Sequence, residues 1–407
     1  MSGFSFQDVP ATIPSSSQDA WEYYLQCMDE ARALALNSTW CKYPVDRAQA
    51  LYNIQMLSAF GFNIYTAPRQ QFPNFYTHTI FLPFEYGFGA PSPDFFYRWA
   101  FLDGTKTYRI WGNRGNTAWA EFQAQGGFWG DEDQFRVGNW DFDDFKLDAD
   151  GSFEIIASPE PHDGNWMKLD PKARNIVLML RDAHYDWLND QALELRIETL
   201  DRTEDAIAHS EAEMDRRLRA IGRMAKFAVQ FFLKMNDDLL AKAGFNTFRP
   251  DELNQHNNVG GNPRAAYVKM LYDIQPDDAL IIETEIPNAR YWSVQLNDVW
   301  WQTTDYAYHQ SCINAGQAAI DSDGKVRMVL SLRDPGVMNW LDPVDFPWGV
   351  AQWRWYLTDR IVTPTVKKVP VTEVRTHLPA ETALVTRDER QSLLAIRRKG
   401  IFNRYGF

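Results

Sequence analysis

A long internal repeat limits the folds open to this chain more than any other feature of its sequence. The segment DADGSFEIIASPEPHDGNWMKLDP at 148–171 returns as DSDGKVRMVLSLRDPGVMNWLDP at 321–343. Matches upstream extend the repeat, because Tyr97, Asp103 and Trp119 have counterparts in Tyr267, Asp273 and Trp292. Each unit therefore covers about 97–190 or 267–357. A repeat of this length predicts a duplicated domain and excludes the short period of a solenoid.

The repeated segment has the pattern of a hairpin turn followed by a strand. Asp-Gly at 150–151 and at 323–324 precedes an apolar run of strand length, and Asp-Gly tolerates the positive backbone angles of a tight turn. A calcium loop of the EF type needs glycine at its sixth position, and here glycine is fourth. We expect Asn165 and Asn339 to hold turns, and the tryptophan after each to fill the space between sheets. The repeat then determines shape, and chemistry is expected where the two copies differ.

Two helices are predicted before the repeats. The first follows a candidate N-cap at Ser17 and covers about 19–35. The second runs over about 46–60 and ends at Gly61. In the second helix the inward-facing residues are expected to be Leu51, Ile54 and Leu57.

The longest helix is predicted between the two units, over 204–243. Asp201 and Glu204 form a capping-box-like start, and Gly244 supplies a C-terminal stop. Apolar residues recur along it at three- and four-residue steps and predict a stripe that faces the core: Met214, Leu218, Ile221, Ala225, Ala228, Val229, Phe232 and Leu239.

These elements predict a mainly β protein with helical segments, built as two tandem β-sandwich or jelly-roll-like domains from an internal duplication. The long helix joins them as a linker. The expected boundaries are an N-terminal arm with helices at 1–63, a first β-sandwich domain at 64–200, the helical linker at 201–250, a second β-sandwich domain at 251–358 and a C-terminal arm at 359–407.

Bulk composition narrows the class of protein. The chain has 407 residues and a formal net charge of −13, which argues against a nucleic-acid partner because phosphate contacts need a basic face. The basic cluster at 397–399 is expected to be a solvated tail. Three cysteines cannot form a disulfide framework, and neither a secretory signal nor a membrane span is visible. A cytoplasmic protein is expected.

Motifs of the second unit carry a family resemblance. ARYWSVQLND, DSDGKVRMVLS, NWLDP and WRWY, within about 262–357, resemble the family known as domain of unknown function 1214. The first unit resembles the N-terminal β-domain that longer bacterial members carry ahead of it. The resemblance implies a β-sandwich architecture and little about activity. Members are often encoded beside catabolic enzymes for aromatic or steroid compounds.

Four segments differ between the copies and supply the candidate site residues. They are YRIWGNRGN at 108–116, RDAHYDW at 181–187, NDVWWQTTDYAYHQS at 297–311 and QWRWY at 352–356. Histidine is the side chain that titrates nearest neutrality, so base candidates are His309, His184 and His78. The other candidate catalytic residues are Asp305, Asp298, Arg109 and Arg354, and the candidate substrate-binding residues are Trp111, Asn113, Tyr185, Trp300, Trp301 and Tyr306. For His309 the competing interpretation is a satisfied core histidine.

Missing motifs restrict the chemistry. The sequence has no GxGxxG after a strand, no GxxxxGK[ST], no GxSxG and no HExxH, and its seven histidines show no ligand spacing. No cofactor and no metal are therefore expected. We predict a cofactor-independent enzyme that acts on an aromatic or polycyclic small molecule, most concretely a carbon–carbon lyase of retro-aldol type that releases a small aldehyde.

Two alternatives and one assembly state complete the expectations. The alternatives are a non-catalytic β-sandwich protein that binds a carbohydrate or hydrophobic ligand through exposed tryptophans, and a purely structural protein without a pocket. Isomerase, hydratase and hydrolase reactions also stay open. A homodimer is expected, in which the segment at 1–16 or at 360–407 packs across the other subunit because sheet edges need cover.

Overall fold

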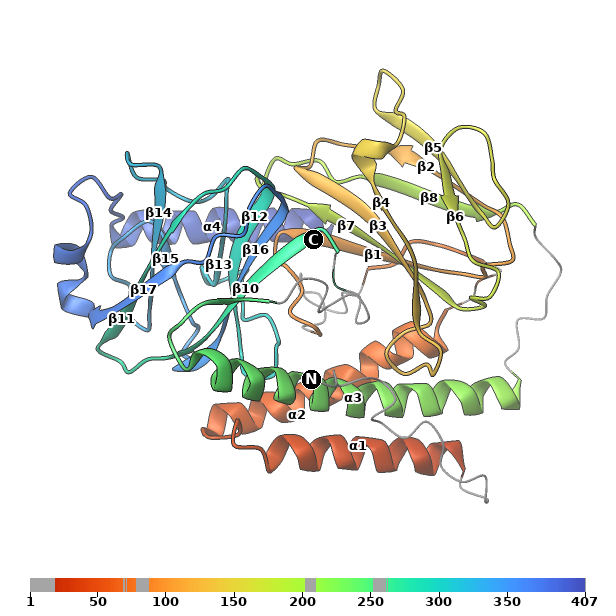
Figure 1. Cartoon of the computed structure of the whole chain (residues 1–407), viewed down its shortest axis with the longest axis horizontal. Coiled ribbons are helices and arrows are strands. Elements are labelled where there is room, and N and C mark those ends of the chain that lie inside the picture. The colour runs from red at the N-terminus through yellow and green to blue at the C-terminus, as the bar shows by residue number, and fades with distance from the viewer. Residues whose placement is uncertain are drawn as a thin grey trace.

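A computed structural model describes residues 19–68, 70, 72–77, 88–201, 210–251, 261 and 263–406. Two β units lie side by side, and three helices form a layer beneath both (Figure 1). The mainly β fold with helical segments is thereby confirmed. The strands of the first unit are β1 (Phe95–Leu102), β2 (Tyr108–Asn113), β3 (Trp119–Gly126), β4 (Phe135–Asp141), β5 (Ser152–Ser158), β6 (Trp166–Lys168), β7 (Ile176–Ala183) and β8 (Glu194–Thr199).

The second unit repeats the strand order of the first and adds one strand, β9, at the edge of one sheet. The first unit contains the sheets β1-β7-β3-β4 and β6-β5-β2-β8, and the second contains β9-β10-β16-β12-β13 and β15-β14-β11-β17. The pair β5–β6 is parallel, and so is its counterpart β14–β15. The second-unit strands are β9 (Arg249–Pro250), β10 (Ala265–Asp273), β11 (Asp278–Glu285), β12 (Ala289–Asn297), β13 (Cys312–Asn314), β14 (Lys325–Ser331), β15 (Trp340–Leu341), β16 (Trp348–Thr358) and β17 (Thr365–Pro370).

An apolar core lies between the two sheets of each unit. In the first, alternate residues of β3, β5 and β7 meet, among them Phe122, Ile155 and Leu178, each at most 1% exposed. In the second, Leu280, Met328 and other residues of β11 and β14 meet the inner face of β10, β12 and β16. Alternate side chains of a strand point to opposite faces, so the remaining residues of β3 and β7 face away from this core; both strands are buried on both faces.

The repeated segment has the predicted turn geometry. Gly151 and Gly324 have φ of +83° and +78°, and the strands β5 and β14 begin directly after them. The asparagine prediction is also confirmed: Asn165 Nδ2 donates to Lys146 O and Glu154 O, and Asn339 Nδ2 donates to Ala319 O and Arg327 O at the matched places.

The prediction for the tryptophans that follow was wrong. Trp340 packs with Ile281 and Val329 on the outer face of its sheet, and neither it nor Trp166 belongs to the clusters between the sheets. Both indoles donate to the backbone of the preceding strand, at Ser158 O and Ser331 O.

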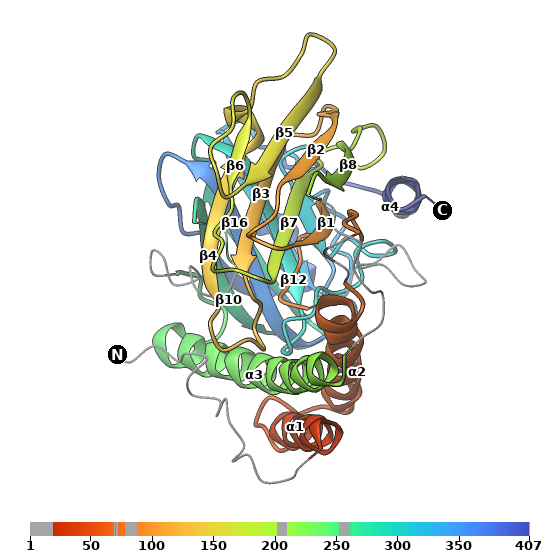
Figure 2. The same ribbon diagram turned by 90° about the vertical axis from the view of Figure 1, so that its right-hand side faces the viewer.

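The helical layer consists of α1 (Ala20–Leu36), α2 (Pro44–Gly61) and α3 (Glu211–Ala243) (Figure 2). A π-helical turn (Phe62–Thr66) continues α2, and a short 3-10 helix (Phe142–Asp144) follows β4. Gly244, at φ +72°, ends α3 as predicted. Asp19 caps α1, while Ser17 lies outside the described residues. Ser210 has an extended backbone and caps α3, so this helix begins at Glu211 and not at 204 as expected.

The inward face of α2 differs from the prediction at one position. Ile54 and Leu57 are buried as expected, but Leu51 is 45% exposed. Its neighbour Ala50 is fully buried instead, and so is much of the α3 stripe from Ile221 to Phe232. The long helix is therefore more than a linker, because it forms a shared core with α1 and α2.

The C-terminal segment is integrated into its own chain. β17 pairs with β11, a 3-10 helix (Val371–His377) follows, and α4 (Arg387–Arg404) packs on the second unit. Arg398 and Lys399 of α4 are exposed as expected, but Arg397 is 7% exposed with its guanidinium carbon 4.4 Å from the ring centroid of Trp187, so the expected solvated tail is wrong for Arg397. Within the described ranges, no helix combines the length and apolar composition that a membrane crossing requires.

Buried polar and aromatic contacts join the two units. The fully buried Asp94 accepts hydrogen bonds from Trp187 Nε1 at 2.7 Å, Tyr291 Oη at 2.5 Å and Asn314 Nδ2 at 2.6 Å. Beside it, Phe95 and Trp119 of the first unit pack against Tyr291 and Tyr356 of the second, with ring centroids 4.9–5.5 Å apart. The outer faces of β1-β7-β3 and β10-β16-β12 are thereby held toward each other.

Candidate active site

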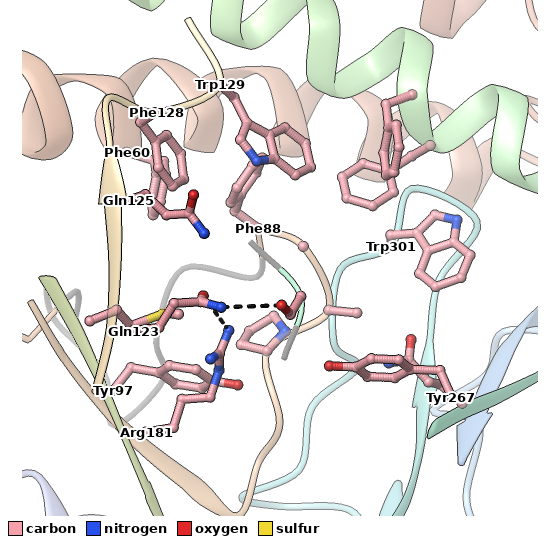
Figure 3. Close-up of a pocket in the computed structure, with 18 of the residues that line it drawn as sticks. Phe60, Phe88, Tyr97, Gln123, Gln125, Phe128, Trp129, Arg181, Tyr267 and Trp301 are labelled. Carbon is pink, nitrogen blue, oxygen red and sulfur yellow. Dashed lines mark hydrogen bonds between the residues drawn. The ribbon is translucent and has the colours of Figure 1, made fainter. Parts of the chain in front are cut away.

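A pocket lies where these two outer faces meet the helical layer. The centre of a water molecule can occupy a volume of ≈ 180 Å³ inside this pocket. Residues of β1, β3 and β7 line one side, residues of β10 and β16 the other, and side chains of α2 and α3 close it (Figure 3). An apolar cavity of about 150 Å³ is enough to hold a benzene ring. The pocket can therefore take an aromatic molecule.

The helix-facing wall of the pocket is aromatic. Its rings are Phe60, Phe88, Trp99, Phe128, Trp129, Phe231, Phe232 and Trp301. They pack on one another, for example Phe88 on Trp129 at 4.9 Å and Phe232 on Trp301 at 5.7 Å. Such a wall suits a flat, apolar ligand.

The opposite part of the pocket is polar, and its first half comes from β1, β3 and β7. Arg181 lies in register between Tyr97 and Glu121. Its guanidinium forms an ion pair of 2.5 Å with Glu121 and donates to Gln123 Oε1 at 3.1 Å. Burial opposes the charged form of Arg181, but the Glu121 carboxylate overcomes it and raises the pKa of the guanidinium.

The second half comes from β10, β12 and β16 and repeats this pattern. Arg354 lies in register between Tyr267 and Ser293. Its guanidinium donates to Gln295 Oε1 and, at 2.6 Å, to Ala90 O. The sets Tyr97-Arg181-Gln123 and Tyr267-Arg354-Gln295 thus occupy matched positions in the two sheets.

Lys269 of β10 is the amine of the pocket. It is 3% exposed, pairs with the Asp251 carboxylate, and its Nζ lies 5.4 Å from the ring centroid of Trp301 and 5.6 Å from that of Tyr267. Burial lowers the pKa of Lys269 below its ordinary value, although the Asp251 carboxylate acts in the opposite direction. A buried lysine with a lowered pKa has the properties of a catalytic base or nucleophile.

A strained turn after β12 positions Trp301. Trp301 has φ of +62°, and its indole donates to Asn236 Oδ1 of α3 at 2.8 Å. Asp298 Oδ1 accepts the backbone N–H groups of Trp300 and Gln302 at 2.9 and 3.0 Å. The buried Asp298 therefore fixes the turn that presents the Trp301 ring to the pocket.

Two of the residues predicted from the sequence line the pocket, namely Arg354 and Trp301. Most of the other candidate catalytic residues lie elsewhere. His309 is half-exposed and hydrogen-bonds Asp342 Oδ2 at 2.8 Å, and Asp305 caps the backbone of Ala307 and Tyr308.

His184 is buried at the junction of the units. Its Nε2 lies 3.6 Å from Asp182 Oδ2, too far for a hydrogen bond, and burial lowers its pKa. Asp298 acts on the pocket only through the turn described above. His78 lies outside the described residues.

The remaining candidates serve structural contacts away from the pocket. Arg109 forms ion pairs with Glu154 and Glu198 and stacks on Trp111, all on the outer sheet of the first unit. Asn113 Nδ2 donates to Asp150 O.

The aromatic candidates are packed into interfaces. Trp300 donates to Asp46 O of α2, Tyr185 stacks on Tyr291 at 5.3 Å, and Tyr306 contacts Trp187 at 6.0 Å. The tryptophans expected to be exposed for sugar stacking, Trp300, Trp301, Trp353 and Trp355, are at most 3% exposed, so that expectation was wrong.

Most of the polar pocket was not among the candidate site residues. Lys269 and Gln125 lie outside the four segments that differ between the copies, whereas Arg181 and Gln352 begin two of these segments but were not chosen from them. A signal was present, because Arg181 and Lys269 each interrupt an otherwise apolar strand, as in LMLRDA and YVKMLY. A charge in such a run must be buried or face a polar cavity. None of the described lining residues is a histidine, aspartate or glutamate. Across the ranges that the structure describes, no three His, Cys, Asp or Glu side chains gather closely enough to hold a metal ion.

Comparisons with known proteins give a family match over part of the chain and a likeness in fold. Residues 100–183 match the model of the family described as protein of unknown function (DUF1214), and this match confirms the family resemblance. The matched residues lie in the first unit, whereas the motifs quoted above lie in the second. No curated protein matches the chain.

Two solved structures are similar to this one. An uncharacterised protein from Burkholderia cenocepacia is 24% identical with a TM-score of 0.80, over 86% of this chain and 97% of that chain. This likeness shows the fold. The VPA0106 protein from Vibrio parahaemolyticus is 12% identical with a TM-score of 0.46, over 84% of this chain and 100% of that chain.

Proposed function

We propose that the protein is a cofactor-independent enzyme that binds an aromatic or polycyclic small molecule in this pocket and cleaves a carbon–carbon bond by a retro-aldol reaction. The observation that carries the proposal is Lys269, a buried amine with a lowered pKa between the rings of Trp301 and Tyr267. Its neutral form can take a proton, and the adjacent rings can hold a flat substrate against it.

The reaction needs only proton transfer and anion stabilisation. The Lys269 amine removes the proton from the hydroxyl group of a β-hydroxy carbonyl compound. The bond between the carbinol carbon and the α-carbon then breaks, so that a small aldehyde leaves and the electron pair forms an enolate on the remaining carbonyl. A pocket guanidinium stabilises the enolate oxygen, and the Lys269 ammonium returns the proton to the α-carbon. Atoms and electrons balance without an oxidant.

Non-catalytic binding of a hydrophobic ligand is the second candidate. It is favoured by the absence of histidine and carboxylate side chains among the described lining residues. Stacking of a carbohydrate on an open tryptophan face has no support, because the candidate tryptophans are buried. A measurement of turnover distinguishes the lyase from the non-catalytic binding protein.

The experiment measures aldehyde release from diaryl β-hydroxy ketones by chelator-treated protein. We compare the wild type with K269M/D251N, which removes the amine together with its counter-ion so that no carboxylate is left unpaired. The matched control is K234M/D238N, the same pair of changes at an exposed ion pair of 2.9 Å on α3. Release by the wild type and the control, with a loss of at least about 100-fold in K269M/D251N, supports the lyase. Equal release by all three proteins removes Lys269 from the chemistry, and no release by any of them favours the binding protein.

The finer expectations on origin and assembly are part of the same proposal. We infer an internal duplication from the matched strand orders and the matched Tyr-Arg-Gln sets. The free state of Cys27, Cys41 and Cys312 supports a reducing, cytoplasmic setting. A homodimer is still proposed, although 360–407 packs on its own chain; sedimentation as a clean monomer at micromolar concentration would exclude it.

A further inference from the structure

The two walls of the pocket are matched in register but differ in charge. In the first unit Tyr97 pairs with Arg181 and Trp99 pairs with Met179. In the second, Tyr267 pairs with Arg354 and Lys269 pairs with Gln352. The tyrosine–arginine pair is therefore common to both units. The next pair along the strands is apolar in the first unit and polar in the second.

The two units also differ in whether the arginine has a counter-ion. Glu121 lies beside Arg181 in the first sheet and forms an ion pair with it, but the matched position beside Arg354 is Ser293. Arg354 is 4% exposed and bonds only neutral acceptors, Gln295 Oε1 and Ala90 O, with no ion pair among the described residues. A buried charge is costly unless it is paired, so an uncompensated guanidinium at a pocket indicates an anionic ligand.

Polar groups around Arg354 have spare hydrogen-bonding capacity. Each terminal nitrogen of a guanidinium carries two hydrogens, and each terminal nitrogen of Arg354 gives one to an acceptor named above. In the same pocket, Gln125 Nε2 is buried without a hydrogen-bond partner in the described part of the chain, and Figure 3 shows its amide beside the pocket. The two protein acceptors hold the guanidinium in place, which favours a planar, bidentate acceptor such as a carboxylate.

We propose that Arg354 forms a carboxylate subsite, and that the ligand is an aromatic acid with its carboxylate at Arg354 and its ring against the aromatic wall. The inference deepens the proposed function by naming the substrate class, but it concerns binding and does not need turnover. Arg181, whose charge Glu121 already balances, is then the guanidinium left for the enolate oxygen.

The test compares acids with their neutral amides. Benzoate, 2-naphthoate and biphenyl-4-carboxylate are titrated against the matched carboxamides at pH 7, with binding followed by tryptophan fluorescence, because Trp99, Trp129 and Trp301 line the pocket. We expect at least one acid to bind about 10- to 100-fold more tightly than its amide, the value of a charge-assisted pair. Absence of a preference for the acid in all three pairs overturns the proposal.

Two variants assign the preference to Arg354. R354Q removes the charge, and S293E supplies to Arg354 the counter-ion that Glu121 supplies to Arg181. Both are expected to abolish the preference for the acid, and S293E is expected to keep or raise the melting temperature. Retention of the preference in either folded variant overturns the proposal; if R354Q does not fold, S293E decides.

Turnover distinguishes this inference from the proposed function. Tight binding of acids without turnover retains the carboxylate subsite and contradicts the lyase. Turnover of neutral substrates as fast as the corresponding acids overturns the subsite and leaves the lyase in place.

Discussion

Replacing Asp298 by asparagine should change the pH dependence of stability, because this carboxyl group is buried in the turn that holds Trp301. Burial raises the pKa of Asp298 to about 7, against ~3.9 for an aspartate in an unfolded chain. Between these two values the folded protein holds a proton that the unfolded chain has lost. The free energy of unfolding therefore falls as the pH rises through this window.

The expected size follows from the two pKa values. From pH 5 to pH 8 the wild type loses about 3 kcal/mol of stability through Asp298 alone. D298N has no group to titrate. Its amide can keep the turn if the Gln302 side chain rotates, because Gln302 Oε1 has no partner among the described residues. The rotation gives up the 3.3 Å bond from Gln302 Nε2 to Gln49 O, which costs about 1 kcal/mol at every pH.

Denaturant unfolding of both proteins at pH 5 and pH 8 measures the effect. D298N should gain about 3 kcal/mol on the wild type between the two pH values. D305N is the control, because Asp305 lies in the same loop and also accepts two backbone N–H groups. The reasoning would be refuted if the free energies of unfolding of D298N and the wild type differed by the same amount at both pH values. An equal gain in D305N would also refute it.

Two further substitutions test sequence-based candidates. H309A should leave ligand binding and turnover unchanged, because His309 lies outside the pocket. The hydrogen bond from His309 to Asp342 raises the pKa of His309 in the folded protein. This pair therefore stabilises the folded protein at a pH below the pKa of histidine in the unfolded chain, and the stabilisation is lost as the pH rises through the pKa of the folded state. The melting temperature of H309A should thus drop more at pH 5.5 than at pH 8.5, and an inactive H309A would contradict this placement. N339A should cost about 1–3 kcal/mol because it leaves buried backbone groups of Ala319 and Arg327 without a partner, whereas N165A, at the more exposed matched turn, should cost less; unfolding midpoints decide.

Much of the fold could be predicted from the sequence because it is encoded locally. The Asp-Gly turns and the stop at Gly244 each act within a few residues, and each was predicted correctly. The error at Leu51 has a tertiary cause: helical spacing gives the width of an apolar face, but the side buried depends on where α3 lies.

The site was predicted less well because it depends on how the two units are joined. Loops that differ between the copies were expected to carry the chemistry, yet the pocket is formed largely by strand residues at matched positions. Arg181 and Lys269 face outward from their own sheets, and only the packing of one unit against the other turns those faces into a cavity. The spacing of residues within one unit does not show how the two units pack against each other.

The assignment of base chemistry to Lys269 is tested most directly by the pH profile of aldehyde release in the wild type and in D251N. Activity needs the neutral amine, so release should rise with pH through the pKa of Lys269. The Asp251 carboxylate raises that pKa, and its neutralisation should move the rising limb of the profile to lower pH. A rising limb at the same pH in both proteins, or one displaced to higher pH in D251N, would contradict Lys269 as the base.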